Sequence, residues 1–350
     1  MVPLFGFATK QYASSWVNLS RWFTRFHSLI NRPMSSHAQA IVFDAPQQLS
    51  IKTLEVKAFE ANDIEVDVTF SGISTGTERL LWDGTMPPFP GLGYPLVPGY
   101  ETVGVVRKVG DNATLSVGDH VFVPGSYTFQ GVRNIFGGAG SRLIVAHDRA
   151  VKVQASLGPQ AVLLALAATC YHAIALGGER QPMVLPELIV GHGVMGRLLA
   201  RITVALGGPA PTVWETQSQR QTGAVGYAVV HPDDDPRKDY KAIYDVSGDS
   251  GLLNALIMRL APGGEVVLAG FYKQDLSFAF APAFMREAQI RAAAQWKKHD
   301  LQAVTHMVET GKLSLEQMIT HTYKLGRATD AYQVAFSDPL CLKMMLDWSS

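Results

Sequence analysis

The chain has 350 residues, which is long enough for two domains with separate hydrophobic cores. Hydrophobic residues make up 47% and charged residues 17% of it, as in soluble globular proteins, and 30 basic side chains balance 30 acidic ones. A net charge of zero gives no electrostatic basis for binding nucleic acid, which favours a basic surface. Cys170 and Cys341 are too few for a disulfide framework, so we expect a reducing, cytoplasmic location.

Residues 1–36 differ from the rest of the chain. They carry four basic residues and no acidic one, and large apolar side chains recur at helical spacing between Trp16 and Ile30. The segment is either an amphipathic targeting or membrane-surface helix, or a disordered upstream extension with Met34 as the true start. We expect the extension, because strand-like patterning begins only at Ala38.

From residue 37 to 160 the sequence shows short alternating strands interrupted by Gly and Pro. Turn residues are dense between Met86 and Gly91 and again at 110–112. This pattern predicts a β-rich, barrel-like domain. The expected strands are Ala40–Phe43, Ile64–Phe70, Thr102–Val109, His120–Val123 and Ser141–Val145.

From residue 161 to 297 strands alternate with helices, which predicts a doubly wound parallel sheet and thus an α/β fold. We expect residues 298–350 to return to the first domain, with 342–348 as a strand that closes it. The apolar stretch 161–176 contains Thr169 and His172 and is too short to cross a bilayer, so we expect a buried helix and no membrane span. The expected strands are Glu187–Gly191, Thr212–Glu215, Ala242–Val246 and Glu265–Ala269, and the expected helices are Gln160–Leu176, Met195–Leu206 and Leu252–Leu260.

A glycine motif of the form G-x-G-x-x-G follows the strand that ends near Val190. The motif alone is a weak signal, but a preceding strand and a following helix are the context in which it binds a dinucleotide. The first glycine permits a tight turn, the second lets the backbone approach a pyrophosphate, and the third lets the helix pack closely. The helix N-terminus then offers free N–H groups to the phosphates. The expected cofactor-binding residues of this motif are Gly191, His192, Gly193, Val194, Met195 and Gly196.

Glu215 ends the next strand, 24 residues beyond Gly191. An acid at this place bonds the adenosine ribose hydroxyls and repels a 2′-phosphate, and no basic residue follows before Arg220. The sequence therefore predicts NAD rather than NADP. Four residues that follow later strands at the same edge either lie near the nicotinamide or form ordinary turns: Asp245, Ser247, Gly270 and Phe271.

This order of a β-rich domain, a Rossmann unit and a C-terminal return resembles the medium-chain dehydrogenase/reductase family. The matching stretches are 72–78, 98–101, 117–121 and 191–196, and the resemblance covers nearly all of 38–348. It implies a GroES-like barrel joined to a Rossmann domain. It also implies an NAD-dependent alcohol dehydrogenase and a homodimer, which is common in the family.

Zinc-dependent members of the family have Cys-Gly-Thr-Asp at the first stretch and Gly-His-Glu at the second. Here Ser74 or Thr75 replaces the cysteine, Tyr100 replaces the histidine, and Ala165 stands where the third ligand is expected. None of these is a good zinc ligand, and residues 127–136 lack the cysteines of the structural zinc lobe. The resemblance therefore implies a member without a bound metal.

The run from Ser74 to Glu101 is unusual for the wider family and is similar to that of members that act on bacteriochlorophyllides. This resemblance implies that NAD oxidises a 3-hydroxyethyl group on a bacteriochlorin to a 3-acetyl group, so the partner is a tetrapyrrole. Such a substrate would bring a cytoplasmic enzyme to membranes. An apolar loop with Trp82, Met86 and Phe89 either lines an open cleft for the macrocycle or makes ordinary core or dimer contacts.

Without a metal, side chains must hold the reacting oxygen. Tyr100 is the first candidate, because its phenol can donate to an alkoxide or pass a proton onward, but it could equally fill the vacated metal site. Thr75 or Ser74 would begin a proton relay or bond its own backbone. Glu101 would orient Tyr100, anchor a nearby Arg or form a structural ion pair.

Two other functions stay open. A zinc-free reductase of quinones or enones fits the same fold, although Glu215 argues against it because such reductases usually prefer NADPH. A nucleotide-binding protein that has lost catalysis together with its zinc also fits.

Overall fold

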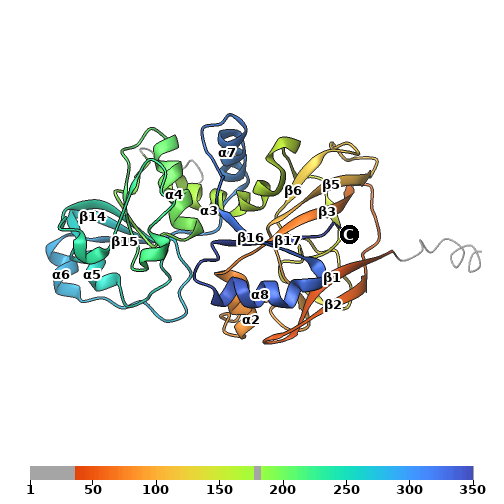
Figure 1. Ribbon diagram of the computed structural model, residues 1–350, viewed down its shortest axis with the longest axis horizontal. Coiled ribbons are helices and arrows are strands. Elements are labelled where there is room, and N and C mark those ends of the chain that lie inside the picture. The colour runs from red at the N-terminus through yellow and green to blue at the C-terminus, as the bar shows by residue number, and fades with distance from the viewer. Residues whose placement is uncertain (1–35, 177–182, 350) are drawn as a thin grey trace, which may run out of the picture.

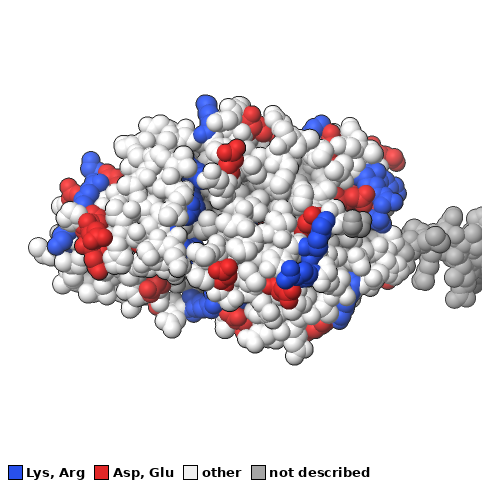
Figure 2. Space-filling view, viewed as in Figure 1, with Lys and Arg blue, Asp and Glu red and all other residues white. Residues whose placement is uncertain are grey.

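The computed structural model describes residues 36–176 and 183–349, so the prediction for 1–36 concerns residues that lie, except for Ser36, outside the described part. Figure 1 shows an elongated molecule with an α/β half at one end and a β-rich half at the other. Charged side chains of both signs are spread over the face in Figure 2, in keeping with the net charge of zero.

Six parallel strands form the sheet of the α/β half, in the order β12-β11-β10-β13-β14-β15. This is the order of a dinucleotide-binding sheet, in which the chain turns back between its first and fourth strands. Here that switch point lies between β10 and β13. The strands are β10 (Leu188–Val190), β11 (Thr212–Trp214), β12 (Ala228–Val230), β13 (Tyr240–Asp245), β14 (Leu260–Leu268) and β15 (Gln289–Ala292).

Helices cover both faces of this sheet because its strands are apolar on both sides. Ile189 packs toward the core under α3, α4 and α7, while its neighbours Leu188 and Val190 pack toward α5 on the opposite face. Continuous apolar strands are typical of parallel sheets. The helices are α3 (Leu164–Ala175), α4 (Val194–Ala205), α5 (Leu253–Ile257), α6 (Phe280–Met285) and α7 (Lys298–Glu309).

Two sheets build the β-rich half. One has the order β2-β1-β4-β7, and the other has the order β16-β17-β3-β5-β6-β9, with β8 paired to β3. The strands are β1 (His37–Ala45), β2 (Gln48–Glu55), β3 (Asp63–Ile73), β4 (Leu96–Val97), β5 (Thr102–Val109), β6 (His120–Val123), β7 (Arg133–Asn134), β8 (Arg142–Ala146), β9 (Val151–Lys152), β16 (Ile319–Lys324) and β17 (Lys343–Asp347), and the helices are α2 (Thr77–Asp83) and α8 (Ala328–Ser337).

The last strand returns to the β-rich half. β17 pairs antiparallel with β3, so that Met344 lies opposite Ile73 and Leu346 opposite Ser71. Just beyond it, the Trp348 indole donates to Ser71 Oγ at 2.8 Å. The predicted closing strand is therefore confirmed.

One helical segment of the described residues, 155–175, is long and apolar enough to cross a membrane. It consists of the 3-10 helix η1 (Ala155–Leu163) followed by α3, so it is longer than the sequence suggested. Nine of the twelve residues of α3 are buried and pack in the core between α4 and α7. The expectation of a buried core helix is confirmed, and core packing accounts for the apolar composition.

The fold class is confirmed as α/β, with a β-rich part and a part built on a doubly wound parallel sheet. Two local predictions are wrong. The helix expected at 252–260 ends at Ile257 because Leu260 already begins β14, and Trp82 lies in α2 rather than in a loop. The domain boundaries at 160/161 and 297/298 stay a prediction.

Candidate active site

The glycine motif forms the tight turn between β10 and α4. Gly191 has φ of +103°, a conformation that L side chains rarely adopt. A Cβ on Gly196 would lie only 1.8 Å from the Gly191 carbonyl oxygen, so only glycine allows the helix to pack this closely. Gly193 precedes the first residue of α4, where helix N–H groups lack intrahelical partners. The turn therefore has the geometry of an anion-binding helix start.

Glu215 lies beside this turn, as expected. One carboxylate oxygen accepts from the His192 backbone N–H at 3.3 Å, and the other accepts from the Gln217 N–H at 2.9 Å. The Arg220 Nε lies 3.8 Å from the same carboxylate, and a Cβ on Gly193 would lie 3.2 Å from the Arg220 Nη2. Arg220 is five residues beyond Glu215 in the sequence and was not expected near the ribose, but the fold places it at the turn.

Arg197 and His192 hold the segment that carries Arg220. Arg197, in the first turns of α4, donates to the carbonyls of His192, Arg220, Thr222 and Gly223 at 2.7–3.3 Å. The His192 ring lies between the Arg220 carbonyl oxygen at 2.7 Å and the Tyr227 hydroxyl at 2.8 Å. Burial lowers the pKa of His192 to about 4, so its neutral ring donates through Nδ1 and accepts through Nε2. The imidazole thus fixes the loop and does not face a ligand.

The residues expected near the nicotinamide gather at the other side of the switch point. Asp245 accepts through one oxygen from the Ser247 N–H at 2.9 Å and the Ser247 hydroxyl at 2.6 Å. A Cβ on Gly191 would lie 3.4 Å from the Ser247 Cα, so this turn borders the glycine motif. The Gly270 N–H and the Tyr272 hydroxyl both donate to the Asp245 carbonyl. Phe271, between them, is 48% exposed.

Tyr100 and Ser74 form a hydroxyl pair in the β-rich half. The Tyr100 hydroxyl donates to Ser74 Oγ at 2.6 Å, and Thr77 Oγ1 lies 3.4 Å from it. Burial raises the pKa of Tyr100, so the phenol stays protonated at neutral pH. Of the two candidates, the fold brings Ser74 to Tyr100, and within the described residues no hydrogen bond joins Thr75 to it.

Glu78, a residue without an expected role, is a buried carboxyl directly behind this pair. One oxygen accepts from the Ser74 N–H at 3.1 Å, and the other accepts from the Tyr332 hydroxyl of α8 at 2.8 Å. Burial raises the pKa of Glu78 to about 7, although both hydrogen bonds oppose the shift. Glu78 therefore ties the segment that holds Ser74 to α8.

Glu101 is fully buried and forms an ion pair rather than touching Tyr100. Its two carboxylate oxygens accept from Lys343 Nζ at 2.7 and 2.9 Å, and the same ammonium donates to the Ile73 carbonyl at 3.2 Å. The cation is thus a lysine of β17 and not the arginine that was one expectation. Burial raises the pKa of Glu101, and the Lys343 charge opposes this.

The three side chains expected to bind the substrate differ in how far they are exposed. Trp82 packs into an aromatic cluster, with ring centroids 5.4 Å from Phe43 and 6.3 Å from Tyr332. Met86 also packs partly buried against this core, whereas Phe89 is 38% exposed. Phe89 is therefore the most accessible of the three.

A shared core cluster and one ion pair connect the β-rich half with the α/β half. Tyr100 packs against the core cluster that also contacts Met195 and Val246, which follow β10 and β13. Lys273, after β14, lies 3.4 Å from the Asp83 carboxylate at the end of α2. The loop after Gly270 and the helix after Ser74 therefore meet across the two halves.

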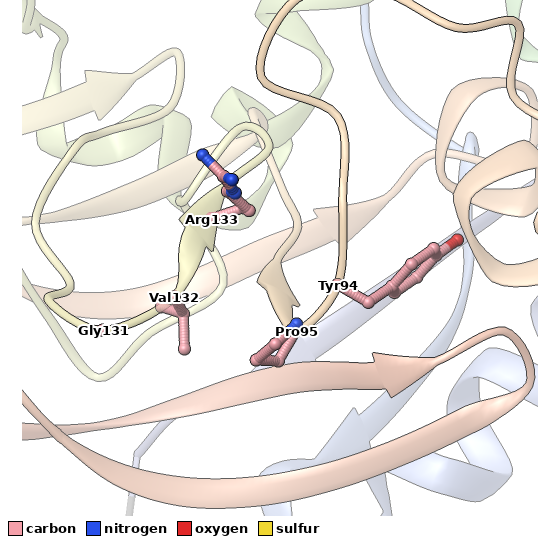
Figure 3. A pocket seen from close by; sticks show the side chains of 5 residues that line it. All are labelled: Tyr94, Pro95, Gly131, Val132 and Arg133. Atoms are coloured by element: carbon pink, nitrogen blue, oxygen red, sulfur yellow. The ribbon is translucent and has the colours of Figure 1, made fainter.

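A separate pocket of about 350 Å³ lies on the β-rich half. Figure 3 shows it between the chain that enters β4 and the chain that forms β7. The Arg133 side chain projects from β7 on the side opposite to Val132, while the Tyr94 ring points away toward α2, where its hydroxyl donates to the Leu81 carbonyl. The pocket is lined by Tyr94, Pro95, Gly131, Val132 and Arg133.

Comparisons with known proteins agree with this geometry. Residues 60–155 match the alcohol dehydrogenase GroES-like domain. The 2-desacetyl-2-hydroxyethyl bacteriochlorophyllide A dehydrogenase of Rhodobacter capsulatus is 52% identical over 311 residues, which cover 89% of this chain and 98% of the relative. The protein with the same name from Cereibacter sphaeroides is 50% identical over 314 residues, or 88% and 98% of the two chains. The chain belongs to this branch of the medium-chain dehydrogenase/reductase family.

Solved structures of the wider family share the fold. An Escherichia coli alcohol dehydrogenase complexed with NADH has a TM-score of 0.76 and 20% identity, covering 89% of this chain and all of that one. A putative zinc-binding dehydrogenase from Sinorhizobium meliloti bound to NADP has a TM-score of 0.75 and 20% identity, with the same coverage. At this identity they support the architecture alone.

Two residues that were not expected at the site, Lys343 and Arg197, are cations within apolar elements. Lys343 is a lone cation in an apolar strand, and Arg197 is a buried cation on an apolar helix. Such charges are rarely buried without a partner. Both therefore pointed to an acceptor elsewhere in the chain, although the sequence could not say which one.

We expect replacement of Lys343 by Met to destabilise the protein by about 3–5 kcal/mol, because it leaves the Glu101 carboxylate buried without a cation. Joint replacement of Glu101 by Leu and Lys343 by Met should recover most of the loss. Chemical denaturation measures both. The control is Lys324→Met, which removes the exposed pair with Asp347 and should cost less than about 1 kcal/mol. Equal losses in K343M and K324M would contradict this assignment.

Glu78 should make stability depend on pH. Because its pKa rises from the usual 4.5 to about 7 in the folded state, the folded protein holds a proton that the unfolded chain releases. This contribution is complete below about pH 4.5 and is lost as the pH rises through 7, on the order of 3 kcal/mol in all. Glu78→Gln should remove it, so denaturation at pH 5 and pH 8 should show a smaller decline than in wild type. Asp330→Asn, at an exposed position, should keep the wild-type decline, and an unchanged slope in E78Q would refute the prediction.

Proposed function

We propose that this protein oxidises the hydroxyethyl side chain of a bacteriochlorophyllide to an acetyl group, with NAD as the hydride acceptor and without zinc. The identity of about one half to relatives with this named activity, over nearly their whole length, carries the proposal. The same relatives favour this activity over a quinone or enone reductase and over a non-catalytic nucleotide-binding protein. The cytoplasmic location and the homodimer stay predictions.

The glycine turn supports binding of a nicotinamide dinucleotide. The close approach of Gly196 to Gly191 brings the start of α4 to the switch point of the sheet, where helix N–H groups can bind a pyrophosphate. Glu215 would bond the adenosine ribose hydroxyls, and Arg220 would lie beside the same ribose. The turns at Asp245–Ser247 and Gly270–Phe271 would border the nicotinamide, which supplies the hydride acceptor when bound.

The hydroxyl pair would handle the oxygen of the carbinol. Because the Tyr100 hydroxyl already donates to Ser74, its oxygen is free to accept the hydrogen bond of the substrate hydroxyl. As the substrate proton passes to the Tyr100 oxygen, the Tyr100 proton would pass to Ser74 Oγ and the original Ser74 hydroxyl proton would be released to water, which leaves Ser74 donating to Tyr100 and Tyr100 donating to the carbonyl product. The raised pKa keeps Tyr100 in the protonated form that this exchange requires. Thr75 stays a candidate from sequence alone.

The residue types at the family's metal positions support a zinc-free site. Ser74, Tyr100 and Ala165 offer neither thiolate, imidazole nor carboxylate. The two buried carboxylates nearby are already engaged, Glu78 by Tyr332 and Glu101 by Lys343. A metal would therefore have to displace interactions that hold the fold together.

Replacement of Tyr100 by Phe should lower kcat by about 100-fold or more, because the oxygen loses its proton-transfer partner while the ring packing stays. The assay is NADH formation from a hydroxyethyl bacteriochlorophyllide, with the acetyl product identified by its spectrum. Tyr127→Phe, at a 70% exposed position, is the matched control and should retain activity. Turnover in Y100F at the wild-type rate would remove Tyr100 from the chemistry, and no turnover in wild type would refute the proposed function.

We expect wild type to use NAD in preference to NADP and Glu215→Gln to reduce that preference by about tenfold or more. Gln keeps a hydrogen-bonding group for the ribose but removes the negative charge that repels a 2′-phosphate, while Arg220 remains beside it. Comparison of kcat/KM for the two cofactors measures the effect. Glu187→Gln, near the opposite end of β10, is the control and should keep the wild-type ratio. Equal use of NADP by wild type would count against Glu215 as the selecting residue.

A further inference from the structure

Arg133 stands apart from the other arginines. Among residues 36–176 and 183–349, every other arginine guanidinium lies within 4.0 Å of a carboxylate oxygen or donates to a carbonyl oxygen. Within the same residues, the Arg133 guanidinium has no hydrogen bond and no ion pair; only its backbone N–H is engaged, with the Pro95 carbonyl at 2.9 Å. An arginine offers a planar set of donors suited to a carboxylate, and this one has no protein acceptor.

Arg133, an exposed residue of β7, lines the pocket shown in Figure 3. A Cβ on Gly93 would lie 3.8 Å from Arg133 Nε, so the side chain lies along the loop that enters β4. On the other side of that loop, the Tyr94 hydroxyl is bound to the Leu81 carbonyl of α2. The wall of the pocket is therefore fixed to the helix that carries Thr77 and Glu78.

A short ladder of strands connects this pocket with Tyr100. β4 and β7 run parallel, with Leu96 beside Arg133, and the ladder continues where the Ile135 N–H donates to the Val97 carbonyl at 2.9 Å. Directly after it, the Phe136 ring packs edge-on against the Tyr100 ring at 5.3 Å. Three residues span at most about 11 Å, so the Cα atoms of Arg133 and Phe136 lie within that distance. The pocket and Tyr100 are thus connected by one short stretch of paired backbone and the contact between the Phe136 and Tyr100 rings.

We propose that Arg133 binds the propionate carboxylate of the tetrapyrrole substrate. The inference rests on the proposed function, because a bacteriochlorophyllide is the free acid of the pigment and carries one ionised propionate across the macrocycle from the hydroxyethyl group. An arginine and a carboxylate form a charge-assisted, bidentate pair, which supplies orientation as well as affinity. With the carboxylate at Arg133 and the carbinol at Tyr100, the ladder between them sets which edge of the macrocycle enters the reacting centre.

The test compares the free acid with its propionate methyl ester, as substrates and as ligands. Arg133→Gln should reduce kcat/KM for the acid by about tenfold or more, as expected for the loss of a charge-assisted pair, and should change that for the ester less than about twofold. Wild type should prefer the acid, and kcat should change less than KM. Arg133→Lys should fall between wild type and R133Q, because it keeps the charge and loses the fork.

Arg107→Gln is the matched control, since it removes the same charge from an exposed ion pair of β5. It should leave the ratio of acid to ester unchanged. An equal effect of R133Q on acid and ester, or no preference in wild type, would overturn the proposal. Equilibrium titrations of the free acid and of the methyl ester, followed by chlorin absorption, test the carboxylate site separately from the proposed oxidation. Acid-selective binding that R133Q abolishes, without turnover, would refute the oxidation and keep the carboxylate site.

Discussion

The buried pair of Glu101 and Lys343 is the interaction on which the arrangement of the β-rich half depends. Neither charge could be buried alone, since an isolated ion in a protein interior costs several kcal/mol. The lysine belongs to the last strand, and the glutamate directly follows Tyr100. The pair therefore holds β17 against β3 in one register. It also fixes the backbone at Tyr100 and, through the Ile73 carbonyl, the backbone before Ser74. One interaction thus places both hydroxyls of the proposed reacting centre.

A second buried carboxyl, that of Glu78, holds Ser74 from the side of α8. Glu78 accepts from the Ser74 N–H and from Tyr332, and Tyr332 packs with Phe43 and Trp82. Where zinc-dependent relatives would orient their ligands by metal bonds, this chain would orient hydroxyls by hydrogen bonds to buried acids. Hydrogen bonds are less rigid than metal bonds, but both acids are fully buried, which restricts their movement. A preorganised site requires a supporting shell that cannot relax.

The sequence was sufficient for the fold class because each signal was local. The strand, glycine turn and helix at 188–205 are adjacent in the chain, and the continuous apolar strands require helices on both faces. The site was less predictable because its interactions join distant segments. Glu101 and Lys343 are 242 residues apart, and Glu78 and Tyr332 are 254 apart. The predicted length of α5 was wrong for another reason. The helix ends after five residues because β14 begins, so its length is determined by sheet pairing rather than by helix propensity.

The cofactor end shows how a loop can alter the meaning of a local signal. From sequence, Glu215 predicts NAD because no basic residue follows it before Arg220. In the fold, Arg197 donates to four carbonyl oxygens, and the His192 ring accepts from the Tyr227 hydroxyl. These bonds fold the segment after Glu215 back, so that Arg220 lies beside the Glu215 carboxylate. A cation there neutralises part of the repulsion that excludes a 2′-phosphate. The Glu215 carboxylate still accepts from the His192 backbone N–H and can also accept from a ribose hydroxyl. A 2′-phosphate could bind there only by displacing the carboxylate. The proposed preference for NAD would therefore depend on the buried His192 and Arg197 that position this loop as much as on Glu215 itself.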